Sequence, residues 1–282
     1  MFSEKYGFQA QKSILIHDVS KNIRARVWNL FYNNEIKAGG LSSIRLQQAI
    51  NGEVSTDEKI ADLLGFVTSS TKKGESAQDK IQKYILFDCE WYELYDFIEK
   101  HLSCLPYDKK QKRIRQYNDL LESEKSGYRI ILGEVSPITN NEELDAITEA
   151  GTTDFASVNE HIKKALLYYS DLQNPDYENS IKESICAVES ICCIITGQSG
   201  SQSTLGNTLK KLENNNIYIH KAMKNAFSSL YGYTSDESGI RHGGVDFTNA
   251  PAEDAKYMLV SCSAFVNYLI EKWCKISNNP ED

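Results

Sequence analysis

Apolar residues recur every three or four positions along most of the chain, which is the spacing of one face of an α-helix. In the first half the pattern is clearest in SKNIRARVWNLFYNNEI, which begins with a candidate N-cap at Ser20, and in KIQKYILFDCEWYELYDFIEKHL. A more polar helix is predicted over DKKQKRIRQYNDLLESEK. Only GYRIIL, residues 127–132, has the character of a strand, so we expect a short extended segment or one arm of a hairpin there.

The second half repeats the helical spacing with more continuous apolar stripes. Long helices are predicted over SVNEHIKKALLYYSDL, ENSIKESICAVESICCIIT and APAEDAKYMLVSCSAFVNYLIEKWCK, and shorter ones over TLGNTLKKLE and IHKAMKNAFSSLYGY. Pro251, Glu253 and Asp254 are typical of a helix start. About four or five helices of this kind fit a helical bundle.

A change of character near residue 150 divides the chain. The segment VSPITNNEELDAITEAGTTDF carries Pro137, a candidate helix cap at Asn140 or Asn141, and Gly151 before the next helix. We therefore place a domain boundary here, to within about ten residues. The predicted fold class is mostly α, with an N-terminal helical domain over residues 1–150 and a C-terminal helical bundle over residues 151–282.

Composition is that of a globular protein. Of the 282 residues, 41% are hydrophobic and 25% are charged, which allows a buried core and an ordinary polar surface. The sequence has no run of about 18 apolar residues, so no membrane span is predicted. The opening MFSEKYGFQA lacks the basic start and apolar run of a secretory signal. We therefore expect a cytoplasmic protein that does not contact a membrane.

Charge, cysteine usage and missing motifs exclude several function classes. The formal net charge of −8 argues against non-specific adhesion of the whole molecule to nucleic acid, although it is compatible with a local basic groove. The seven cysteines form no C-x-x-C pair, so neither a zinc site nor a disulfide framework is expected. The sequence also lacks a G-x-x-x-x-G-K-[ST], a G-x-S-x-G and an H-E-x-x-H motif. We expect no cofactor and no metal.

The densest combination of reactive side chains lies in SDESGIRHGGVDF, near the end of the chain. Arg241 offers a charged fork suited to phosphate, and the imidazole of His242 exchanges protons near neutral pH. Three glycines around the pair would let a ligand approach the backbone closely, and Asp236 and Glu237 could orient the pair. The alternative is a glycine-rich loop in which Arg241 pairs with those acids and nothing is catalysed.

Two further features are candidates for supporting roles. Glu189 flanks the apolar stripe of a predicted helix, where it is either structural or part of a polar cleft that holds Arg241. The run KKQKRIRQ is the densest positive patch of the chain, and it is either a solvated helix face or a contact with the RNA backbone. The basic residues of this run are Lys109, Lys110, Lys112, Arg113 and Arg115.

The run NPDYENSIKESICAVESICCIITG, followed by LYGYTSDESGIRHGG and a long final helix, resembles the C-terminal domain of AbiJ-type abortive-infection proteins. That domain is similar to the HEPN fold, a helical bundle common in prokaryotic defence and toxin proteins. The opening FSEKYGF, with IRARVWNLFY, resembles one of the N-terminal domain types attached to such proteins. The resemblance covers most of the chain and is stronger in the second half.

The resemblance implies a metal-independent endoribonuclease that acts as a dimer. Its motif is an arginine, a polar residue behind it and a closing histidine. Arg241 and His242 match the first two positions, whereas Asp246, Phe247 and Thr248 stand where the closing histidine is expected. Either His242 is itself the acid or base, with Asp246 orienting it, or the catalytic site is lost and the domain only binds.

The expected function is that of an antiphage protein. Its C-terminal HEPN-like bundle would cleave RNA as a homodimer, and its N-terminal domain would sense a phage-derived or cellular trigger, select the target or restrain the nuclease. Two alternatives stay open. One is a catalytically silent module that binds RNA, a nucleotide or a protein partner. The other is a helical scaffold in which the Arg241 loop only caps the final helix.

Overall fold

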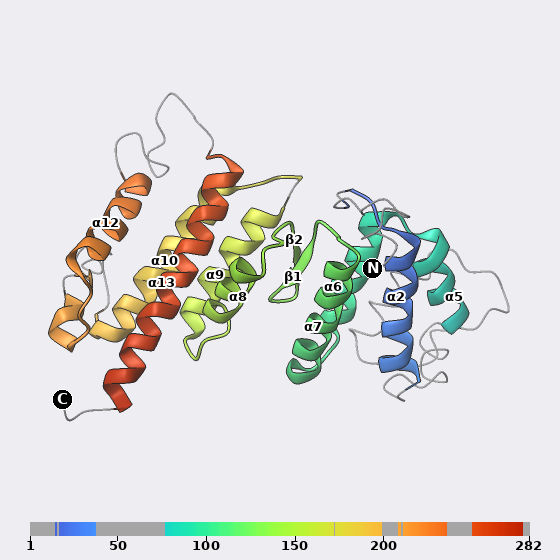
Figure 1. Cartoon of the computed structure of the whole chain (residues 1–282), viewed down its shortest axis with the longest axis horizontal. Coiled ribbons are helices and arrows are strands. Elements are labelled where there is room, and N and C mark those ends of the chain that lie inside the picture. The colour runs from blue at the N-terminus through green and yellow to red at the C-terminus, as the bar shows by residue number, and fades with distance from the viewer. Residues whose placement is uncertain are drawn as a thin grey trace, which may run out of the picture. The chain divides into compact units, whose positions relative to one another are not determined.

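The computed structural model describes residues 15, 17–37, 77–171, 173–198, 208–209, 211–235 and 250–278. Helices dominate these residues, and the strands among them form one two-stranded sheet, so the predicted mostly α fold class is confirmed (Figure 1). The chain divides into two compact units, Met1–Thr139 and Asn140–Asp282. This division assigns the helix Asn141–Ala150 to the second unit. The boundary predicted at residue 150 assigned the same helix to the first domain.

The helices of the first unit share one apolar core. They are α2 (Lys21–Phe31), the π-helix η1 (Tyr32–Ile36), α5 (Ala77–Lys83), a second π-helix η2 (Tyr84–Asp88), α6 (Trp91–Ser103) and α7 (Tyr107–Ser123). The hydroxyl of Ser20 accepts a hydrogen bond from the Ile23 N–H at 3.1 Å, so Ser20 caps α2 as predicted. The regularly spaced apolar residues of these helices are fully buried, among them Ile23, Phe31, Ile85, Leu94, Ile98 and Leu121.

A β-hairpin follows α7 in the first unit. Strand β1 (Arg129–Ile131) pairs antiparallel with β2 (Glu134–Ser136). Leu132 and Gly133 form the turn with φ angles of 55° and 102°. Positive φ at both turn residues gives a twist that matches the twist of the two strands, which is why a two-residue turn can close this hairpin.

The second unit is a bundle of helices. It contains α8 (Asn141–Ala150), α9 (Ala156–Ser170), α10 (Tyr177–Thr196), the 3₁₀ turn η3 (Leu212–Asn215), α12 (Lys221–Ser235) and α13 (Ala252–Asn278). Helix α10 packs against α9 and α13, and α8 packs against α13 (Figure 1). The apolar stripes predicted from the sequence supply the fully buried side chains of this bundle, among them Ile162, Ile181, Ile185, Val188, Leu259 and Val266.

The longest helices of the second unit are α10, with 20 residues, and α13, with 27. Asp176 begins α10 by accepting a hydrogen bond from the Asn179 N–H at 3.0 Å, and Gly197 ends it in the left-handed conformation, with φ of 64°. Both helices interrupt their apolar stripes with polar residues. Within the described ranges, no helix is both long enough and apolar enough to cross a membrane.

Candidate functional site

The residues predicted to be catalytic fall outside the described part of the chain. Arg241, His242 and Asp246, with the supporting Asp236 and Glu237, belong to the segment between α12 and α13. Their roles therefore stay predictions from the sequence. The description resumes at Ala250, a buried residue just before α13.

Glu189, the remaining supporting residue, lies half-buried on α10. It contributes to the raised pKa of Cys192, which reaches about 12 mainly because the thiol is buried and next because of Cys193. The neighbouring Ser190 shares a hydrogen bond of 2.6 Å with Ser157 on α9. Glu189 therefore lies near the polar edge at which α9 and α10 meet.

His161 and Glu183 form a second polar contact between α9 and α10. Nδ1 of His161 lies 2.7 Å from Oε2 of Glu183, and the two side chains are 31% and 21% exposed. A histidine oriented by a carboxylate and accessible to solvent is an arrangement that acid–base sites use. No sequence pattern indicates this pair, because its members are 22 positions apart and lie on different helices.

The basic residues predicted to bind RNA do not share one surface of α7. Lys109, Lys112 and Arg115 are exposed, Lys110 is half-buried, and Arg113 is only 5% exposed. The same helix also carries the exposed acids Asp108, Asp119 and Glu122. The positive charge of α7 is therefore less one-sided than the run KKQKRIRQ indicates.

Arg113 belongs to the interior of the first unit rather than to the predicted RNA-binding face. Its Nη2 donates to Oε1 of Glu35 at 2.5 Å, and its Nη1 donates to Gln116. The same Glu35 oxygen lies 3.3 Å from Nε2 of His101, whose Nδ1 is 2.9 Å from the Tyr117 hydroxyl. The network connects η1 to α6 and α7.

The charges of this network stabilise one another. Burial alone would raise the pKa of Glu35, yet the pKa is lowered because the nearby imidazole of His101 and the guanidinium of Arg113, which donates a hydrogen bond to the carboxylate, stabilise its negative charge. Burial lowers the pKa of His101, and the attraction of Glu35 only partly opposes that shift. The arrangement is that of a structural ion pair in a core.

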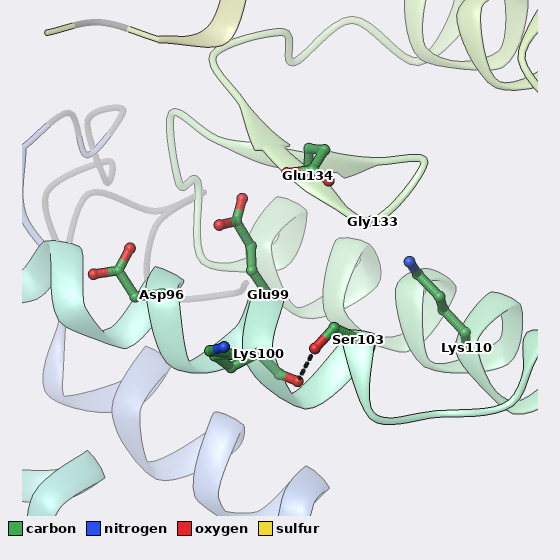
Figure 2. Close-up of a pocket in the computed structure, with 7 residues that line it drawn as sticks. All are labelled: Asp96, Glu99, Lys100, Ser103, Lys110, Gly133 and Glu134. Atoms are coloured by element: carbon green, nitrogen blue, oxygen red, sulfur yellow. Dashed lines mark hydrogen bonds between the residues drawn. The ribbon is translucent and has the colours of Figure 1, made fainter. Parts of the chain in front are cut away.

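A pocket of about 420 Å³ opens between α6, the first turns of α7 and the hairpin turn (Figure 2). Apart from one glycine, the residues that line it have charged or polar side chains, which also present their aliphatic parts to the pocket. Carboxylates, ammonium groups, one hydroxyl and one glycine line it, from Asp96, Glu99, Glu134, Lys100, Lys110, Ser103 and Gly133. Sequence reasoning singled out only Lys110 of these, because the others form no motif and come together only in the folded unit.

Glu99 is the most strongly perturbed group of the pocket. Burial raises its pKa to about 7; the nearby charges of Glu134 and Asp96 act in the same direction, and a hydrogen bond of 2.5 Å from the Val135 N–H opposes them. The pKa of Asp96 is also raised, first by burial and then by Glu93. In the described part of the chain, neither Glu99 nor Asp96 takes part in an ion pair.

The family of the chain follows from its first 153 residues. The family model AbiJ N-terminal domain 4 matches residues 1–153, which is more than half of the chain. The chain belongs to the AbiJ family. The predicted AbiJ-type character is thereby confirmed, and with it the place of this protein among abortive-infection, antiphage proteins. The match contains the buried Glu35 network and the pocket. No curated protein and no solved structure matches the chain.

Proposed function

We propose that this AbiJ-type protein is an endoribonuclease whose second half is a HEPN-like domain that cleaves RNA without a metal. The observation that carries the proposal is the Arg241–His242 pair in a glycine-rich segment of an AbiJ-type chain. The packing of α9, α10 and α13 supports it, because the resemblance to HEPN domains calls for a helical bundle around such a segment.

The proposed chemistry uses side chains alone. A base removes the proton of a ribose 2′-hydroxyl, whose oxygen attacks the adjacent phosphorus while the bond to the 5′-oxygen of the next nucleotide breaks. Arg241 stabilises the charge that develops on the phosphoryl oxygens, and His242, oriented by Asp246, transfers protons. The products are a 2′,3′-cyclic phosphate and a 5′-hydroxyl.

The partners in this proposal are RNA, a second copy of the chain and a trigger. Two copies would bring two Arg241–His242 pairs to one cleft in the cytoplasm, as the resemblance implies. The AbiJ domain would then sense a phage-derived or cellular trigger, or restrain the nuclease until infection. The exposed Lys109, Lys112 and Arg115 of α7 are candidates for contacts with the RNA backbone.

The test is cleavage of end-labelled RNA by the purified full-length protein in the presence of EDTA. We expect Arg241→Ala and His242→Ala to lower the cleavage rate by about a hundredfold or more, because each removes a group that acts on the reacting phosphate. His220→Ala is the matched control, since His220 is an exposed histidine at the start of α12. Its rate should equal that of the parent.

Two outcomes would redirect the proposal. Equal cleavage by the parent and both alanine variants would place the catalytic site elsewhere. RNA binding without any product would favour the catalytically silent module, for which the absence of the closing histidine is the specific argument. In that case Asp246→His is the variant to examine next for a gain of cleavage.

A further inference from the structure

Helix α13 carries a second apolar stripe besides the one that it buries in the bundle. Its members follow one another at helical spacing, and we call them the outer stripe: Tyr257, Val260, Ser261, Ala264 and Tyr268. Tyr257 is 59% exposed, Ala264 is also exposed, and the other three are half-buried. None of the five is charged, although the solvent-facing side of a helix normally carries charged residues. Exposed patches of this kind mark surfaces that another molecule covers.

The contacts of α13 fix the direction in which the outer stripe faces. Successive residues of a helix are about 100° apart, so Asn267 and Phe265 lie on opposite flanks of the stripe. On one flank, the Asn267 amide donates to the Ala146 carbonyl of α8. On the other flank, Phe265 stacks on Phe227 of α12. Because α13 is held on both flanks, it cannot rotate to bury the outer stripe within its own bundle.

Large and small side chains follow one another along the outer stripe in an order that is the same in both directions. Tyr257 and Tyr268 stand at its ends, and Ser261 and Ala264 stand between them, each four residues from the nearer tyrosine. A twofold axis between Ser261 and Ala264 would place Tyr257 of one copy beside Tyr268 of a second copy, and the reverse. The small residues at the axis let two helices approach closely. The stripe is therefore self-complementary for an antiparallel pair of α13 helices.

The two ends of α13 differ in charge. Glu253 and Asp254 lie in its first turn, whereas Lys272 and Lys275 outnumber Glu271 near its last turns. Of these residues, Glu253 and Lys275 are exposed on the same side of the helix as the outer stripe. In an antiparallel pair the acidic end of each helix meets the basic end of the other, and the helix dipoles also oppose one another. A parallel pair would bring like charges together instead.

We propose that the outer stripe of α13 binds the outer stripe of a second copy of this chain, with the two helices antiparallel around a twofold axis between Ser261 and Ala264. A second copy fits better than an unrelated protein, because an unrelated partner requires neither the symmetric order of side chains nor the opposite charges at the two ends. The role of this dimer in RNA cleavage rests on the proposed function, in which two copies act together. The dimer itself does not depend on RNA.

The first test is the mass of the full-length protein in solution, measured by sedimentation equilibrium over a range of concentrations. We expect a dimer at micromolar concentration. Tyr257→Ala should raise the dissociation constant of this dimer by about tenfold or more, because aromatic side chains that become buried contribute most to such contacts. Tyr107→Ala is the matched control, since Tyr107 is a 65% exposed tyrosine of α7, and it should leave the dissociation constant unchanged.

A second test separates loss of the proposed contact from loss of folding. Ala264→Lys and Ala264→Glu each place like charges close to the twofold axis, so each variant alone should be a monomer at the concentrations at which the parent is a dimer. A mixture of the two variants should regain the dimer, because unlike charges then meet at the axis. Lysine and glutamate both suit an exposed helical position, so the circular dichroism of each variant should equal that of the parent.

Three results would overturn the proposal. The first is a parent that stays monomeric throughout, which would assign the outer stripe to another segment of this chain or to a different protein. The second is a dimer that Tyr257→Ala and Ala264→Lys leave unchanged, and the third is a mixture of the two Ala264 variants that stays monomeric. RNA cleavage enters none of these measurements. A dimer without cleavage therefore counts against the proposed nuclease alone, and a monomer that cleaves RNA counts against the dimer alone.

Discussion

Glu35 and Glu99 are carboxylates in the interior of the same unit, and the structure shifts their pKa values in opposite directions. Glu35 lies beside Arg113 and His101, which lower its pKa although burial acts against them. Within the described ranges, the partner of Glu99 is the Val135 N–H alone, and burial raises the pKa of Glu99 to about 7. At neutral pH the first carboxylate is stabilised in its charged form by its partners, whereas the second is close to its folded-state pKa and has no counterion among the described residues.

The Arg113 network leads to a prediction about stability. Arg113→Met would leave Glu35 buried without its guanidinium partner, and we expect the free energy of unfolding to fall by about 3 kcal/mol. Urea denaturation of the full-length protein at neutral pH measures this loss. Arg115→Met changes an exposed arginine of the same helix and should stay within about 0.5 kcal/mol of the parent. Equal losses in the two variants would show that Arg113 has no structural role.

Glu99 gives a prediction about pH. Because its pKa is higher in the folded state than in the unfolded chain, the folded protein binds this proton more tightly. The resulting stabilisation is complete below a pH of about 4.5 and is lost as the pH rises through about 7. Glu99→Gln removes this dependence. Above the folded-state pKa it should therefore be more stable than the parent, by about 1 to 2 kcal/mol after allowance for solvent screening.

Urea denaturation at acidic and slightly alkaline pH measures the difference between the parent and Glu99→Gln. The gain of the variant should shrink as the pH falls, because the parent carboxyl is then protonated and resembles the amide. A variant that is less stable than the parent at alkaline pH would contradict the raised pKa. Glu142→Gln serves as the control, since it removes an exposed charge from α8.

At the scale of elements, periodicity predicted the helices and missed what depends on contacts between them. Ile181, Ile185 and Val188 repeat at helical spacing and are all buried on α10, so their pattern was sufficient to predict both the helix and its buried face. Strand β2 has the sequence EVS, which is too short and too polar to be recognised alone. Its position follows from the turn at Gly133 and from the contact with Glu99, and both require the folded unit.

For the candidate sites too, sequence spacing does not predict contacts between elements that are far apart in the chain. Arg113 precedes Tyr117 by four residues and Leu120 by seven, so helical spacing already places it on the buried face of α7. Its partner Glu35 lies 78 positions away and could not be predicted from that spacing. The pocket likewise combines residues of two helices and a hairpin, none of which forms a local motif. For Arg241 and His242, the sequence remains the source of the assignment.

At the scale of the whole molecule, α8 determines where the chain divides. The family match extends through this helix, to residue 153, yet the helix packs on α13. Asn267 of α13 donates to the Ala146 carbonyl at 3.0 Å and to Glu149 at 3.1 Å, and Lys256 pairs with Glu143 at 2.9 Å. These contacts with α13 make α8 part of the second unit, although the family model includes α8 with the first unit.

This placement predicts how fragments of the chain behave. A fragment of residues 140–282 retains α8 and should unfold cooperatively in urea when followed by circular dichroism. A fragment of residues 151–282 loses the buried Leu144 and Ile147 and leaves the Asn267 amide without its partners on α8. We expect it to be less stable by about 3 kcal/mol or more, because two large apolar side chains no longer cover α13. Equal midpoints and slopes for the two fragments would mean that α8 adds nothing to the bundle, and the division would then belong at residue 150.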